Sequence, residues 1–142
     1  MTFPCEIGWN WPEASENATA CAVLVHNASE LRRRLADIQA AAQARHIAIA
    51  VNVMTLEKNA FSVVLGLADG CIVTYDGKGG DPPYFVSLGE ARRDTYLVSY
   101  FYGVQRSELP ASHLIPEDVA LDALIDSIEN EEPSPLIDWY GG

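Results

Sequence analysis

Short runs of apolar residues recur along the chain, and their length and alternation predict β-strands. The clearest run is residues 46–53, where Ile47, Ile49, Val51 and Val53 are spaced to line one face of an extended segment. Further strands are predicted at residues 20–26, 61–67, 71–75, 84–88 and 95–102, with a final short strand at 136–140.

Two other segments have the spacing of amphipathic helices. The first begins at Asn27, whose side chain can cap the helix with Glu30 as its capping-box partner, and it runs to about Arg45. The three consecutive arginines at residues 32–34 point in different directions around such a helix, so we interpret them mainly as a solvated flank. The apolar stripe of this helix is predicted to comprise Leu31, Leu35 and Ile38.

The second helix is predicted to start at Pro116, whose missing N–H costs nothing there, and to end near residues 131–133. Asp118, Asp122 and Asp126 recur every four residues, so their side chains stack on one exposed face. No basic residue at helical spacing offsets their mutual repulsion. The buried stripe is predicted to comprise Leu121, Leu124, Ile125 and Ile128.

Successive strands with short connections, such as the turn signal Asp69-Gly70, favour antiparallel pairing of neighbours. The predicted class is therefore α+β, an antiparallel meander sheet with two main helices packed on it. Residues 103–115 predict an irregular connection, and residues 1–19 predict an irregular N-terminal arm or an edge strand. The length of 142 residues, 49% of them hydrophobic, fits one domain over residues 1–142.

The charge of the chain is strongly negative and unevenly distributed. The formal net charge is −11. Residues 1–106 carry nine basic and eleven acidic residues, a balance of −2, whereas residues 107–142 carry nine acidic residues and no basic one, a balance of −9. Such a chain repels phosphate backbones and anionic lipid, so we expect no direct binding to nucleic acid or to a membrane. A basic protein partner is the simplest positive interpretation, and solubility alone is the alternative.

Few residues point to catalysis or to a cofactor. The three cysteines, Cys5, Cys21 and Cys71, are widely spaced and form no zinc-binding pattern with histidine. The glycine-rich segment 77–81 lacks the Gly-Lys-Ser/Thr ending of a phosphate-binding loop, so we interpret it as a mobile hairpin loop. No signal peptide and no membrane span are evident, which predicts a reduced cytoplasmic protein. We expect no catalytic residues, no cofactor and no metal.

The C-terminal half contains an ordered set of short motifs. They are Pro83-Tyr84, Ser87-Leu88-Gly89, Phe101-Tyr102-Gly103, Ser107-Glu108-Leu109-Pro110, Leu114-Ile115-Pro116, Ala120, Ala123, Pro133 and Ile137-Asp138-Trp139. These motifs resemble those of immunity protein family one of bacterial polymorphic toxin systems, over about residues 83–139. That resemblance implies a small α+β protein that binds a toxin domain inside the producing cell and blocks its active site. The toxins of this family are frequently zinc-dependent nucleic-acid deaminases, with nucleases as the other common kind.

The leading hypothesis is an immunity protein that inhibits a toxin acting on nucleic acid, with a DNA or RNA cytosine deaminase as the first candidate. An acidic chaperone or adaptor for a basic protein, and a small enzyme that uses a carboxylate or Cys21, are the alternatives. Gly89, Gly103, Pro116 and Trp139 are expected to be structural. The predicted partner-binding residues are Asp76, Lys78, Asp81, Tyr84, Glu108, Asp118, Asp122, Asp126, Glu131 and Glu132.

Overall fold

The computed structural model describes residues 3–12, 21–89 and 96–141, and it has the predicted α+β architecture. The sheet runs in the order β2-β1-β3-β4-β5-β6-β9, and β7 branches from β3 to pair with β8. The described elements are β1 (Cys5–Trp9), β2 (Cys21–Val25), α1 (Ala28–Ala44), β3 (Ile49–Met54), β4 (Asn59–Leu65), β5 (Ile72–Lys78), β6 (Phe85–Leu88), β7 (Leu97–Tyr102), β8 (Gln105–Pro110), the 3-10 turn η2 (Ala111–His113), α2 (Glu117–Asn130) and β9 (Asp138–Gly141).

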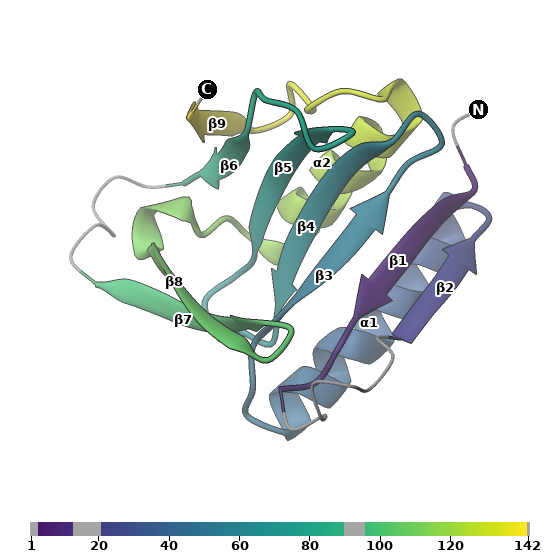
Figure 1. Cartoon of the computed structure of the whole chain (residues 1–142). Coiled ribbons are helices and arrows are strands. Elements are labelled where there is room, and N and C mark those ends of the chain that lie inside the picture. The colour runs from purple at the N-terminus through teal and green to yellow at the C-terminus, as the bar shows by residue number, and fades with distance from the viewer. Residues whose placement is uncertain (1–2, 13–20, 90–95, 142) are drawn as a thin grey trace.

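Both helices cover the same face of the sheet (Figure 1). Alternate residues of the central strands point into this layer, as the alternation in residues 46–53 predicts, and Val51, Phe61 and Val63 are fully buried there. The predicted stripe residues of α1, Leu31, Leu35 and Ile38, are buried against the sheet. In α2, Leu124, Ile125 and Ile128 are buried as predicted, whereas Leu121 is only partly buried.

The start of α1 confirms Asn27 as the N-cap residue. It does not confirm Glu30 as the capping-box partner of Asn27. The backbone N–H of Glu30 donates to the Asn27 side chain at 2.9 Å, as expected for the N-cap. The Glu30 carboxylate, however, accepts from the backbone N–H of His26 at 2.8 Å rather than from Asn27. This hydrogen bond lowers the pKa of Glu30 below its ordinary value.

The N-terminal segment differs from the prediction. Residues 5–9 form β1, which pairs antiparallel with β2 on one side and with β3 on the other, so this segment is an inner strand. Residues 13–20 lie outside the described residues. Trp9 packs against the core, and the Arg45 guanidinium lies 4.0 Å from the centre of the Trp11 ring. The two tryptophans therefore pack on the fold.

The second difference concerns the segment predicted as an irregular connection. Residues 105–110 form β8, which pairs antiparallel with β7 along its whole length, and η2 follows directly. The meander stops at β6, because β9 rather than β7 pairs with β6. The hairpin β7–β8 and η2 instead cover part of the sheet face that the helices leave free, through a second core cluster that includes Ala50, Val64, Ile72, Val98 and Leu114.

Candidate functional site

The predicted partner-binding residues fall on different parts of the surface. The acids of α2 lie on the helix layer, whereas Asp76 belongs to β5 and lines a hollow on the opposite face of the sheet. Glu108 is exposed on β8. The fold therefore does not gather these residues into one site.

Two of the three aspartates on α2 already have partners within the chain. Arg32 of α1 donates to Asp122 at 2.5 Å, although both side chains are about half exposed. The Asp126 carboxylate accepts from Asn130 at 2.9 Å and from the Ser134 hydroxyl at 2.6 Å, which ties the helix to the segment that follows it. The repulsion along this face is thus partly relieved by contacts that helical spacing does not reveal.

The other exposed acids on and beside α2 differ from Asp122 and Asp126 in their side-chain contacts. None of their four carboxylates has a hydrogen-bond or ion-pair partner within the part of the chain that the structure describes: Glu117, Asp118, Glu129 and Glu132. Asp118, Asp122 and Asp126 lie one turn apart along α2, as the spacing predicts, but Asp122 and Asp126 already have partners within the chain.

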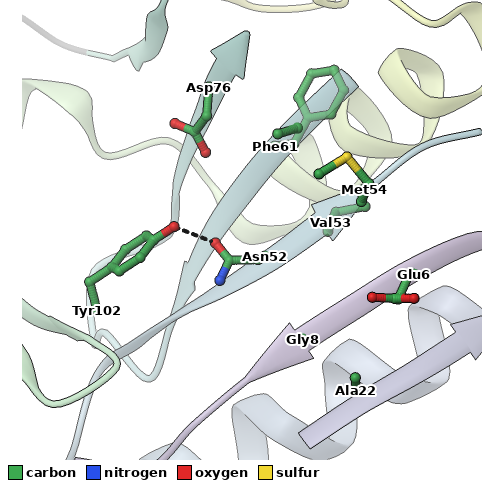
Figure 2. A pocket seen from close by; sticks show the side chains of 10 residues that line it. Glu6, Gly8, Ala22, Asn52, Val53, Met54, Phe61, Asp76 and Tyr102 are labelled. Carbon is green, nitrogen blue, oxygen red and sulfur yellow. Dashed lines mark hydrogen bonds between the residues drawn. The ribbon is translucent and has the colours of Figure 1, made fainter. Parts of the chain in front are cut away.

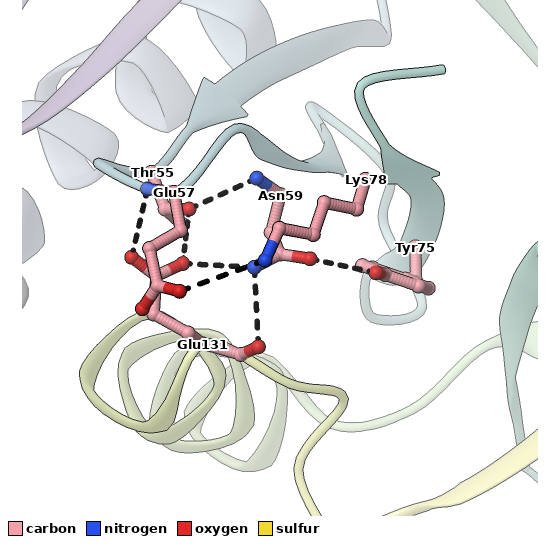
Figure 3. Close-up of polar contacts among 6 residues, drawn as sticks. All are labelled: Thr55, Glu57, Asn59, Tyr75, Lys78 and Glu131. Atoms are coloured by element: carbon pink, nitrogen blue, oxygen red, sulfur yellow. Dashed lines mark hydrogen bonds and ion pairs between the residues drawn. The ribbon is translucent and has the colours of Figure 1, made fainter. Parts of the chain in front are cut away.

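Glu131, one of the predicted partner-binding residues, has a structural role within the fold. It caps the C-terminus of α2 in a left-handed conformation, with φ 55°. Its carboxylate accepts from the Thr55 hydroxyl, from the backbone N–H of Glu57 at 3.1 Å and from the Asn59 side chain at 2.9 Å (Figure 3). Asn59 in turn accepts from the Tyr75 hydroxyl at 2.7 Å. This network joins the end of α2 to the β3–β4 turn.

The residues of the glycine-rich loop are partly used by the fold as well. Gly77 and Lys78 belong to β5, so the mobile loop that the sequence predicts is reduced to a tight turn after this strand. Lys78 is exposed and lies 3.6 Å from the Glu57 carboxylate. The Tyr84 hydroxyl donates to the backbone oxygen of Gly80 at 2.6 Å, and Asp81 is exposed beside it.

The sheet face opposite the helices contains a hollow of about 400 Å³ (Figure 2). Glu6 and Asp76 lie on opposite sides of it, and Tyr102 stands at the end nearest the β7–β8 turn. The Tyr102 hydroxyl donates to Asn52 at 2.9 Å. The lining residues are Glu6, Gly8, Ala22, Asn52, Val53, Met54, Ala60, Phe61, Asp76 and Tyr102.

Asp76 is held in place by two hydroxyl groups of the same face. Ser62 donates to one carboxylate oxygen at 2.8 Å and Thr74 to the other at 3.0 Å. Burial raises the pKa of the Tyr102 hydroxyl above its ordinary value, and the negative charge of Asp76 raises it further. The same two causes, in the same order, raise the pKa of Tyr100. The negative charge of Asp76 therefore acts on both tyrosines of β7.

Sequence reasoning missed most of this hollow. It selected Asp76 but omitted Glu6, Asn52 and Tyr102, because Glu6 lay in a segment predicted as an arm or an edge strand. The alternation of Cys5 and Ile7 around Glu6 was the available signal for an inner strand with Glu6 on its outer face.

Within the described residues, no group of three or more histidine, cysteine, aspartate or glutamate side chains is arranged to hold a metal ion. His113 is buried, and its Nδ1 lies 2.8 Å from the backbone oxygen of Ser87, so it serves the junction between η2 and β6. No helix in the same residues is both long and apolar enough to span a membrane.

Cys5 and Cys71 are expected to resist alkylation in the folded protein. Burial raises the pKa of the Cys5 thiol to about 11 and that of Cys71 to about 12, so the reactive thiolate is scarce and shielded at mildly alkaline pH. Treatment with iodoacetamide, followed by peptide mass spectrometry, should leave both unmodified until denaturant is added. Rapid alkylation of either one in the native protein would contradict this burial.

Comparison with known proteins identifies a family. Residues 19–140 match the family model described as Immunity protein Imm1. The match covers most of the chain and extends well beyond the motifs in its C-terminal half. No curated protein and no solved structure matches the chain.

Proposed function

This chain belongs to the Imm1 family of immunity proteins, and we propose that its cognate toxin is a domain that acts on nucleic acid, with a DNA or RNA cytosine deaminase as the specific activity. Imm1 proteins inhibit toxins without catalysing a reaction, so the chain is one half of a toxin–immunity system. We further propose that it works in the cytoplasm of the producing cell, as one domain, by blocking the toxin's access to its substrate.

The acidic surface is the observation that supports a toxin acting on nucleic acid. Such a toxin must attract a polyanion and therefore carries a basic substrate groove. An inhibitor with a net charge of −11 complements that groove, and complementary charge raises the rate and specificity of association. A base deaminase meets the same requirement, because it takes up a single base of a polyanionic strand in a zinc-containing pocket.

Co-expression tests the proposal. The toxin domain encoded beside this chain should kill cells when produced alone, and equimolar production of this chain should restore growth. Sequencing of nucleic acid from the unprotected cells should show cytosine-to-thymine changes, which are absent from the protected cells. Strand cleavage without base changes would replace the deaminase with a nuclease.

A purified mixture distinguishes inhibition from chaperoning. The chain should abolish the activity of the toxin domain on single- or double-stranded nucleic acid at a one-to-one ratio. Continued killing in the co-expression strain, or unchanged turnover in the mixture, would contradict the proposal. Undiminished turnover with a stable complex would support an acidic chaperone or adaptor instead.

A further inference from the structure

We propose that the toxin domain docks on the uncovered part of the sheet, by placing an arginine- or lysine-bearing loop in the hollow between Glu6 and Asp76. This inference rests on the proposed function and adds to it the surface that binds the toxin. We call this surface the open face. It consists of the outward-facing residues of β1 to β5 that neither the helices nor the β7–β8 hairpin cover.

Strand register explains why the open face is hollow. Gly8 of β1 is paired with Ala22 of β2 and with Asn52 of β3, so two of the three side chains in this row are absent or small. In the next row, Met54 is paired with Ala60. A floor of glycine and alanine leaves the backbone accessible between taller neighbours, which is the shape that an inserted side chain requires.

The charge of the hollow selects a cation. Glu6 and Asp76 both line it, and no lysine or arginine is among its described lining residues. Asp76 is oriented by Ser62 and Thr74, so its carboxylate is positioned before a partner arrives. Carboxylates form their strongest hydrogen bonds with guanidinium and ammonium groups. A second hollow of about 380 Å³ shares Glu6 with the first, and Lys58 is the one basic residue among the described residues that line it.

Exposed apolar side chains surround Glu6 and provide the contact area that a stable interface needs. Leu24 and Met54 are its register partners on the two neighbouring strands, and they are 51% and 39% exposed. Leu56 lies beyond Met54 and is 53% exposed, and Tyr102 is 49% exposed at the other end of the hollow. Apolar and aromatic groups around a charged centre are typical of protein interfaces, and they also pack against the aliphatic part of an arginine or lysine.

The acids of α2 are a weaker candidate for the main contact. Asp122, Asp126 and Glu131 hold the fold together through Arg32, Ser134 and Asn59, so a partner would have to displace existing hydrogen bonds to use them. The remaining acids, Glu117, Asp118, Glu129 and Glu132, are exposed and line neither of the two hollows. They are suited to long-range attraction of a basic toxin rather than to close contact.

Two charge-matched double variants test the open face. The double substitution Glu6→Lys and Asp76→Lys reverses the charge of the hollow. The double substitution Asp118→Lys and Glu129→Lys makes the same change in net charge on α2. The probe is the toxin domain encoded beside this chain, inactivated by one substitution, and its dissociation constant is measured by calorimetry. We expect the open-face variant to bind about 100-fold more weakly and the α2 variant about 3-fold more weakly or less.

A third variant separates binding from folding. Ala22 is an exposed strand residue at the edge of the hollow, and Ala22→Trp fills the hollow without removing a charge or a hydrogen bond. It should retain the unfolding midpoint of the wild type and lose at least about 10-fold in affinity. Labelling of carboxyl groups with a carbodiimide provides a measurement on the wild-type chain. The toxin domain should protect Glu6 and Asp76 from labelling and leave Asp118 and Glu129 accessible.

Each outcome bears on one proposal. Loss of affinity confined to the α2 variant, with Asp118 and Glu129 protected from labelling, would overturn the open face and place the contact on α2. Unchanged affinity in the Ala22→Trp variant would overturn it as well. In both cases the wild-type chain still inhibits the toxin, so the proposed function stands. If the wild-type chain itself does not bind the toxin domain, the proposed function fails first.

Discussion

Replacing Glu131 with alanine should lower the free energy of unfolding by about 3 kcal/mol, although the sequence predicts a surface acid at this position. The carboxylate accepts hydrogen bonds from Thr55, from the backbone of Glu57 and from Asn59. Hydrogen bonds to a charged group each contribute about 1.5–3 kcal/mol, and donors left buried without an acceptor add a desolvation penalty. Thr55 and Asn59 are both buried, so water replaces the lost acceptor poorly.

Glu132→Ala is the matched control for this substitution. Glu132 is the next residue, is exposed and carries the same charge, so its replacement should change the free energy of unfolding by less than about 0.5 kcal/mol. Urea denaturation followed by circular dichroism measures both variants. Glu131→Gln should lie between them, because an amide retains one acceptor oxygen and replaces the other by a donor that faces existing donors. Equal stability of the Glu131→Ala and Glu132→Ala variants would show that the network does not hold the end of α2.

The role of Glu131 shows where sequence reasoning stops. Helical spacing and capping signals predict α1 and α2, and short alternating apolar runs predict most strands, because these signals lie within a few residues of one another. The contact between Glu131 and Asn59 joins residues 72 positions apart, and the contact between Arg32 and Asp122 joins residues 90 positions apart. Nothing in local spacing distinguishes an acid used in this way from one that faces water.

The wrong predictions for the segments that form β1 and β8 have a similar cause. Strand β8 is polar at most positions and contains no alternation of its own, so its pairing with β7 decides its conformation. Strand β1 does alternate, but it becomes an inner strand only because β2 and β3 pair with it from both sides. A tertiary partner thus overrides a weak local preference in both segments.

The candidate site was predictable only in part for the same reason. Its sign of charge follows from composition, and Asp76 was selected from a segment rich in turn residues. The hollow itself is produced by the register of three strands, which aligns Gly8 with Ala22 and Asn52. Register depends on side-chain packing across the whole sheet and cannot be obtained from the sequence of one strand.

Gly89→Ala should lower the free energy of unfolding by about 3 kcal/mol or more, whereas Gly103→Ala should cost about 1 kcal/mol. A Cβ atom on Gly89 would lie 2.0 Å from the backbone oxygen of Leu114 and 3.2 Å from that of Ser112. The backbone N–H of Gly89 also donates to Ser112 at 2.6 Å, so the clash would separate β6 from η2 and break that hydrogen bond. Backbone atoms, unlike the end of a flexible side chain, cannot move aside cheaply.

Gly103 is the informative comparison. Like Gly89 it belongs to the motifs on which the family resemblance rests, but the physical reason for a glycine is different at this position. It occupies the β7–β8 turn with φ +63°, and nothing lies within 4 Å of a Cβ atom built there. The cost of its replacement is therefore only that of a side chain in the left-handed region. Thermal unfolding of the two variants should separate them clearly, and equal losses would show that the contact between β6 and η2 can widen. Gly89 neither lines the open-face hollow nor adjoins a residue that does, so a Gly89→Ala variant that remains folded should bind the toxin domain with unchanged affinity.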